Sequence, residues 1–159
     1  MDKKIRNVVY IAVSAALICL ATLIIRIPMP FTGYVNFGDG VIIALANHFG
    51  PMIAIGSAIG SGLADLIAGY PVYIPATAII KGLIALIICF PRKKDLGIKE
   101  FIIRSIVAEA VMILGYFIYE SILYSPATAA TAILGNIMQG LFAVVLGTLL
   151  YTQIKKIKF

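Results

Sequence analysis

The chain has 159 residues, of which 62% are hydrophobic and only 13% are charged, and its net charge is +6. A soluble domain is about half apolar and a quarter charged, so this chain cannot hide its apolar surface within itself and must use lipid as its solvent. The length allows about six spans of roughly 20 residues with short loops, which excludes an additional soluble domain and a nucleic-acid-binding surface.

The apolar runs are continuous rather than alternating, which favours helices over a β-barrel. We therefore predict an all-α integral membrane bundle that forms one domain over residues 1–159. The predicted spans are, in chain order, residues 7–25, 37–49, 52–68, 76–90, 99–124 and 129–154. The second span is short for a bilayer, so we expect it to be tilted or protected by its neighbours.

Basic residues gather in three clusters: at the start of the chain, between the fourth and fifth spans, and at the end. They are Lys3, Lys4, Arg6, Arg92, Lys93, Lys94, Lys99, Arg104, Lys155, Lys156 and Lys158. The positive-inside rule places all three clusters, and hence both termini, in the cytoplasm. Residues 29–36 and 69–75 are then outer loops, and a third outer loop opens at Ser125.

Small residues mark the helix contacts that we expect. In the third span Gly56, Gly60 and Ala64 form one row at intervals of four, and close packing at such residues holds helices together in lipid. In the first span, Ala12 and Ala16 have the same spacing. That pair either packs within the bundle or docks a partner helix.

Ionisable residues inside the spans are the strongest functional signal. A charge at the bilayer centre costs about 2.5–3.5 kcal/mol on insertion scales, so Asp65, Lys81, Glu109 and Glu120 must face a partner or a cavity. Lys81 and Glu109 have similar predicted depth and are candidates for a buried ion pair, and Asp65 is also within reach of Lys81 if the third and fourth spans are antiparallel neighbours. Glu109, Tyr116 and Glu120 share one helix face. Either these groups only lock the bundle together, or they line a pocket.

The pocket interpretation is favoured because one lysine faces an excess of carboxylates and amides. Tyrosines near the outer ends of the spans could stack on a flat heterocycle, although some of them belong to an interfacial aromatic belt. The predicted substrate-binding residues are Asn36, Asp39, Asp65, Tyr73, Lys81, Glu109, Tyr116, Glu120, Asn136 and Gln139.

No catalytic set, metal cluster or Walker A lysine is found in the sequence. We therefore expect no enzyme activity, no cofactor and no bound metal. If the protein concentrates a ligand, the energy must come from elsewhere.

The sequence resembles the S components of energy-coupling factor (ECF) vitamin transporters. This resemblance covers the whole chain and is carried by the six spans, by Ala12-x-x-x-Ala16 and by Asn36-Phe-Gly-Asp-Gly40. The segments Phe49-Gly-Pro51, Leu63-Ala-Asp-Leu66, Gly69-Tyr-Pro71 and Ile80-Lys-Gly82 resemble in particular the HmpT/PdxU-like branch, which takes up hydroxymethylpyrimidine or pyridoxine-type precursors.

The resemblance implies a subunit of the bacterial cytoplasmic membrane that binds a vitamin from outside, in a pocket made by the outer loops and the outer ends of spans 4 to 6. It also implies docking through Ala12 and Ala16 on a shared transmembrane coupling subunit that two cytoplasmic ATPases drive, followed by toppling in the membrane. Three alternatives stay open: an S component for riboflavin or thiamine, a non-transporting structural subunit, and a secondary transporter with Glu109 as a proton site.

Overall fold

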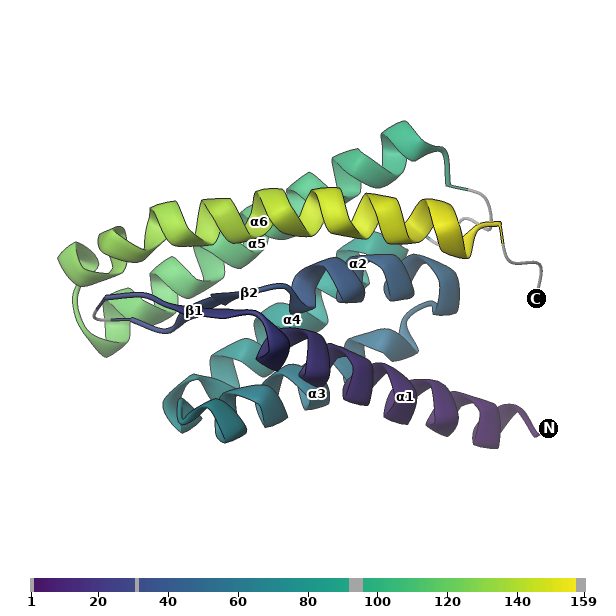
Figure 1. Cartoon of the computed structure of the whole chain (residues 1–159), viewed down its shortest axis with the longest axis horizontal. Coiled ribbons are helices and arrows are strands. Elements are labelled where there is room, and N and C mark those ends of the chain that lie inside the picture. Colours follow the sequence, from purple (N-terminus) through teal and green to yellow (C-terminus); the bar gives the residue numbers. More distant parts are fainter. Residues whose placement is uncertain (1, 31, 92–95, 157–159) are drawn as a thin grey trace.

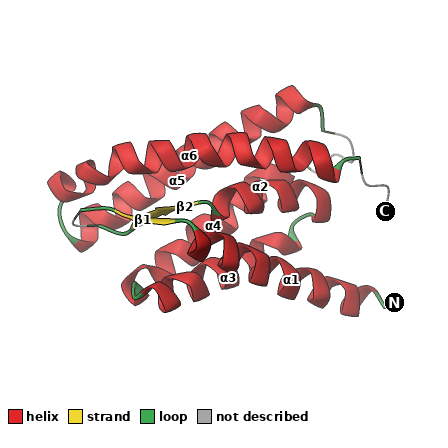
Figure 2. Ribbon diagram, viewed as in Figure 1, coloured by secondary structure: helices red, strands yellow, loops and turns green. Residues whose placement is uncertain are grey.

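The computed structural model describes residues 2–30, 32–91 and 96–156. Six α-helices and one β-hairpin make up this described part of the chain (Figure 1 and Figure 2). They are α1 (Lys3–Ile24), β1 (Arg26–Pro28), β2 (Tyr34–Asn36), α2 (Gly38–Phe49), α3 (Met52–Ala68), the short 3-10 helix η1 (Pro71–Tyr73), α4 (Ile74–Cys89), α5 (Ile98–Leu123) and α6 (Pro126–Ile154). The predicted all-α membrane bundle is confirmed, and the helices follow the predicted spans to within a few residues.

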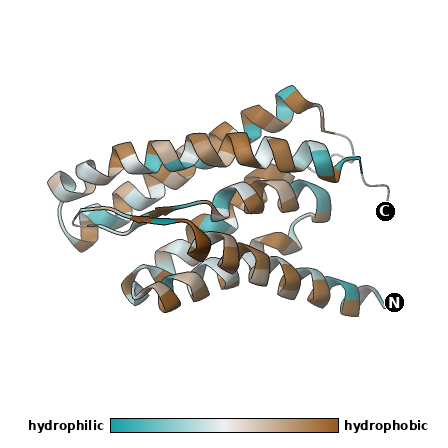
Figure 3. Cartoon of the chain, viewed as in Figure 1, coloured by the Kyte–Doolittle hydropathy of each residue, from teal (hydrophilic) through white to brown (hydrophobic). Residues whose placement is uncertain are grey.

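Four of the long segments are apolar enough to cross a membrane: Lys4–Ile24, Pro71–Cys89, Ile98–Leu123 and Pro126–Ile154. Large apolar side chains remain exposed along them, including Leu17 on α1, Leu114 on α5 and Leu141 on α6. Figure 3 shows hydrophobic residues along the length of these helices. Because exposed apolar surface of this extent is stable only in lipid, the chain is a multi-pass membrane protein.

The helix α2 is only 12 residues long, which corresponds to about 18 Å and falls short of the roughly 30 Å hydrocarbon core. Its apolar residues Ile42, Ile43 and Ala46 are completely buried. Its neighbours are α1, α3, α4 and α6, and Figure 1 shows it between α6 and α1. The expected protection of this short span by its neighbours is therefore confirmed.

Close contact between α1 and α3 depends on two glycines. A Cβ atom added at Gly60 would lie 2.4 Å from the Ala15 carbonyl oxygen, and one added at Gly56 would lie 2.1 Å from the Ser14 hydroxyl oxygen. Ser14 and Ala15 are accordingly buried. The expected packing of span 3 at small residues is confirmed.

Ala12 and Ala16 lie on the other side of α1 and are exposed. The internal contacts of this helix use Ser14, Ala15 and Ile18, each of which is buried. Of the two interpretations of the Ala12–Ala16 pair, packing within the bundle is therefore wrong, because the bundle lies on the opposite face. The pair remains free to meet lipid or another protein.

The first outer segment is more ordered than the loop that we expected. Arg26 pairs with Asn36, Ile27 with Val35 and Pro28 with Tyr34 in an antiparallel hairpin. This hairpin lies against α6 at Gly135, where an added Cβ would meet Met29 at 2.2 Å and Val35 at 3.3 Å. The hairpin therefore forms a cover over the ends of the helices rather than a free loop.

The start of α1 and the end of α6 lie at one end of the bundle, and the hairpin lies toward the other end (Figure 1). Lys4, Arg6, Lys99, Lys155 and Lys156 are all exposed. The positive-inside rule assigns the end with the start of α1 and the end of α6 to the cytoplasm and the hairpin end to the outside. Four further members of the predicted basic clusters lie outside the described residues: Arg92, Lys93, Lys94 and Lys158.

We predict that Gly60→Ala destabilises the protein by about 1–3 kcal/mol, because the new methyl group overpacks the contact between α1 and α3. The measurement is the free energy of unfolding in mixed micelles. Gly97→Ala is the matched control, since a Cβ at Gly97 would meet nothing within 4 Å. Equal stabilities of the two variants would contradict the close approach of α1 to α3.

Candidate binding site

A small polar cavity lies between the hairpin and the outer parts of the helix bundle. Its volume is about 30 Å³. Side chains from α1, β2, α3, α4, α5 and α6 all reach it, so it sits where five of the six helices meet the hairpin. It is lined by Thr22, Met29, Gly33, Tyr34, Asn36, Ser61, Asp65, Tyr73, Thr77, Lys81, Tyr116, Glu120, Asn136 and Gln139.

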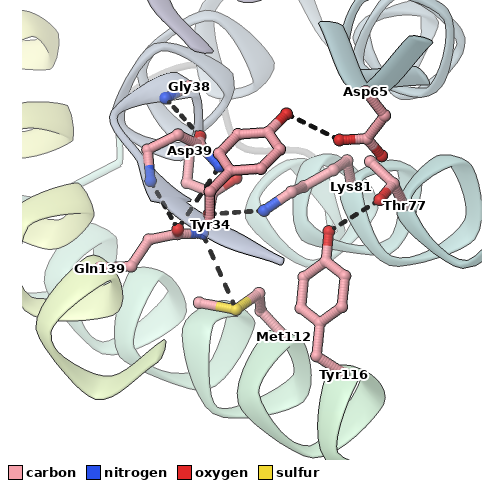
Figure 4. A network of polar contacts seen from close by, with 10 residues as sticks. Tyr34, Gly38, Asp39, Asp65, Thr77, Lys81, Met112, Tyr116 and Gln139 are labelled. Carbon is pink, nitrogen blue, oxygen red and sulfur yellow. Dashed lines mark hydrogen bonds and ion pairs between the residues drawn. The ribbon is translucent and has the colours of Figure 1, made fainter. Parts of the chain in front are cut away.

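Lys81 and Asp39 form a buried ion pair at the inner wall of this cavity. Nζ of Lys81 lies 2.7 Å from Oδ2 of Asp39, and the two side chains are 2% and 0% exposed. Nε2 of Gln139 donates to the same carboxylate oxygen at 2.6 Å, and Figure 4 shows these three side chains converging. The ammonium also lies 5.2 Å from the centre of the Tyr116 ring, within cation–π range. Asp39 and the Tyr116 ring therefore stabilise the Lys81 ammonium in this position, and Gln139 positions the Asp39 carboxylate.

The same amide connects this pair to the hairpin. The backbone N–H of Asn36 donates to Oε1 of Gln139 at 2.8 Å, and the Asn36 side chain accepts from the backbone N–H of Gly38 at 2.9 Å. The second contact satisfies a free N–H at the start of α2. Asp39 in the first turn of α2 is also favoured there by the helix dipole. One network therefore joins β2, α2, α4 and α6.

Two further carboxyl groups lie at the cavity, and each accepts a hydrogen bond from a tyrosine. The Tyr34 hydroxyl donates to Oδ1 of Asp65 at 2.7 Å, and the Tyr73 hydroxyl donates to Oε1 of Glu120 at 3.2 Å. Burial, followed by the Asp65 carboxylate, raises the pKa of Tyr34. The Tyr34 hydroxyl therefore stays protonated and remains a donor to Asp65.

The remaining oxygens of these groups give the cavity an excess of acceptors. Oε2 of Glu120 and Oδ2 of Asp65 are buried without a hydrogen-bond partner among the described residues, as are the hydroxyl oxygens of Ser61 and Thr22. Thr77 interacts with the Asp65 carboxylate, but its hydroxyl also bonds to the Tyr116 hydroxyl at 3.0 Å. Buried acceptors are normally satisfied, so these atoms are suited to a ligand that donates hydrogen bonds.

Every predicted binding residue except Asp39 and Glu109 lines the cavity. Asp39 lies beneath it as the partner of Lys81, and Glu109 lies on the inward face of α5, 3% exposed. Lys81 pairs with Asp39 rather than with either of the partners considered from the sequence, Glu109 and Asp65. The expectation compared depths in the long spans and did not consider α2, whose first turn brings Asp39 against α4.

Several residues at the cavity were not predicted as binding residues, namely Thr22, Met29, Gly33, Tyr34, Ser61 and Thr77. Thr77 precedes Lys81 by four residues and therefore shares its helix face, which is a signal that could have found it. Thr22 carries no comparable signal, since it reaches the cavity only because α1 runs into the hairpin. Within the described ranges, no group of three or more His, Cys, Asp or Glu residues is arranged to hold a metal ion.

We predict that Lys81→Met destabilises the protein by about 3–5 kcal/mol, because it leaves Asp39 buried without its cation. Adding Asp39→Leu should recover most of this loss, since replacing a whole buried pair with apolar residues is often neutral. Unfolding of both variants in mixed micelles provides the comparison. If the double variant were as unstable as the single one, the cost would not come from the unpaired charge.

Comparison with known proteins agrees with this architecture. The family model described as "ECF-type riboflavin transporter, S component" matches residues 2–156. The chain is also similar to a protein of Pyrococcus woesei described as "Uncharacterized protein in gap 3'region", with 33% identity over 132 residues that cover 82% of this chain and 88% of that protein. Since the family model spans nearly the whole chain, this protein belongs to the family of ECF-type riboflavin transporter S components, the substrate-binding membrane subunits of vitamin transporters.

Proposed function

We propose that this protein captures pyridoxine or hydroxymethylpyrimidine, a single-ring vitamin or vitamin precursor, in the outer cavity and delivers it to an ECF-type importer. The observation that carries the proposal is the pair of half-satisfied carboxyl groups, Asp65 and Glu120, on a cavity that also contains Lys81. These ligands carry hydroxyl or amino donors for the carboxyl oxygens. They also carry a ring nitrogen, and pyridoxine a phenolic oxygen, that an ammonium or amide can meet.

Cavity size supports a small ligand. A volume of about 30 Å³ is the scale of a water molecule, whereas ligand sites are usually about 300–1,000 Å³. Binding therefore requires the cavity walls to move apart, and a single ring requires less movement than a larger molecule. Tyr34, Tyr70 and Tyr73 form a chain of ring contacts at this wall, with centroids 5.2 and 6.2 Å apart. Separation of such rings would expose flat faces for stacking.

Riboflavin is the second candidate, and the description of the matching family favours it. Its ribityl hydroxyls would donate to the same carboxyl oxygens, but its three-ring system needs a far larger opening of the cavity. The two candidates therefore differ in the size of the rearrangement that they require.

We further propose that the protein works in the bacterial cytoplasmic membrane with a transmembrane coupling subunit and two ATPases. The chain carries no Walker A motif, so hydrolysis must occur in another subunit. Ala12 and Ala16, which are exposed on α1, offer a small-residue face for the coupling subunit because such residues allow close helix approach.

The decisive experiment is a thermal-shift screen of the purified protein with pyridoxine, hydroxymethylpyrimidine, thiamine and riboflavin, followed by calorimetry. We expect a single-ring ligand to bind most tightly. Glu120→Gln should weaken it by about 10- to 100-fold, the cost of a hydrogen bond to a charged group. Glu100→Gln, which changes an acid in the first turn of α5 that does not line the cavity, is the control and should bind as the wild type does.

Tightest binding of riboflavin would establish the second candidate instead. If no ligand in the screen binds, the proposal fails.

We also predict that the free vitamin binds at least about 100-fold more tightly than its phosphate ester. The phosphate would approach the carboxyl groups of Asp65 and Glu120, and juxtaposed like charges cost several kcal/mol. Calorimetry with pyridoxine and its 5′-phosphate measures the ratio. The double variant Asp65→Asn/Glu120→Gln should reduce it, and an unchanged ratio would show that neither carboxyl group faces the ligand.

A further inference from the structure

Glu109 is a buried acid that the candidate site does not use. Its side chain is 3% exposed, and both of its carboxyl oxygens lack a hydrogen-bond partner within the part of the chain that the structure describes. It lies on α5 against α6, where a Cβ added at Gly140 would be 3.1 Å from the Glu109 Cβ and 3.4 Å from its Oε2. The glycine therefore admits the acid into a closed contact between two membrane helices.

The charged groups that act on Glu109 come from two other helices. They are Asp39 on α2 and Lys81 on α4. From α6, Gln139 directs its amide to Asp39 rather than to Glu109. Lys81 already lies 2.7 Å from Asp39. The cluster thus holds two carboxyl groups and a single ammonium, which is matched to one of them.

If both acids were ionised, the cluster would carry one uncompensated negative charge inside the membrane. Burying an ionised carboxylate without a partner is so unfavourable that the group normally takes up a proton instead. Asp39 has an ammonium and an amide to stabilise its charge, whereas the Glu109 carboxyl group has no hydrogen-bond partner among the described residues. The proton therefore belongs on Glu109.

We propose that Asp39 and Glu109 hold one proton between them, and that Glu109 carries it while Lys81 is paired with Asp39. Oδ1 of Asp39 also has no hydrogen-bond partner among the described residues, so it is available to receive that proton. If Lys81 moved toward Glu109, the O–H bond at Glu109 would break and one would form at Asp39. One ammonium, one carboxylate and one neutral acid would remain, and the net charge would stay at zero.

This shared proton has a consequence for the cavity. Lys81 lines the cavity as well as contacting Asp39, so a movement of its ammonium would otherwise leave a bare carboxylate behind. Because either acid can serve as counter-ion, Lys81 can change partner without a buried net charge. Glu109 is therefore a second counter-ion that Lys81 can use when it leaves Asp39, and we call it the reserve counter-ion. It acts through Lys81 and does not line the cavity itself.

Infrared spectroscopy of the full-length, ligand-free protein in nanodiscs tests the proposal without reference to any vitamin. At neutral pH we expect the carbonyl stretch of a protonated carboxylic acid, which shifts in deuterated water. Because Asp65 and Glu120 also have a buried carboxyl oxygen without a partner among the described residues, the measurement is made in the Asp65→Asn/Glu120→Gln background. In that background Glu109→Gln should abolish the band, whereas the control Glu100→Gln should keep it. A band that persists in Glu109→Gln would overturn the proposal.

Asp39→Asn provides a second test. The remaining counter-ion for Lys81 is then Glu109, which should release its proton to solvent. In the same Asp65→Asn/Glu120→Gln background the band should therefore disappear although Glu109 is unchanged. Persistence of the Glu109 band in this variant would contradict the role of reserve counter-ion.

Thermal unfolding gives a third readout. Glu109→Gln should lie within about 4 °C of the wild-type Tm, because a neutral amide replaces a neutral acid of similar shape. The double variant Asp39→Asn/Glu109→Gln should lose more than the sum of the single losses, since Lys81 then has neither counter-ion. Additive losses would overturn the proposal.

A sodium-dependent rise in the wild-type Tm that Glu109→Gln removes would also overturn the proposal, because the site would then bind a metal cation.

Discussion

The ion pair between Lys81 and Asp39 is the contact on which the outer half of this molecule depends. Lipid offers no solvation for an ammonium, so Lys81 can be buried only where a carboxylate reaches it. Asp39 reaches it at 2.7 Å because α2 begins inside the bundle, beside α4. Gln139 and Asn36 then extend the contact to α6 and to the hairpin. A single unpaired charge would therefore disturb four elements together.

Small residues supply the second constraint, because apolar helices gain little by leaving lipid for each other. Gly56 and Gly60 bring α3 against α1, Gly135 admits the hairpin, and Gly140 admits Glu109. Each glycine thus places a polar or functional element where a larger side chain would exclude it. The same small residues therefore determine both how closely the helices pack and where the polar groups lie.

Most of the candidate site could be predicted because ionisable residues in an apolar helix have few acceptable positions. Asp65, Lys81 and Glu120 had to face inward, and they line one cavity. Their partners could not be predicted in the same way. Tyr34 bonds to Asp65 across 31 positions of sequence, and Asp39 bonds to Lys81 across 42. Contacts at such separations depend on the order of helices around the bundle, which hydropathy does not encode.

The sequence by itself determined the membrane environment, the six helices and the inward direction of the polar residues. These follow from hydropathy and helical spacing, which are local properties of the chain. Only the tertiary structure decided that Lys81 pairs with Asp39 rather than Glu109, that Ala12 and Ala16 face away from the bundle, and that the first outer loop is a hairpin. These features depend on which helices become neighbours, and that is set by packing across the whole bundle.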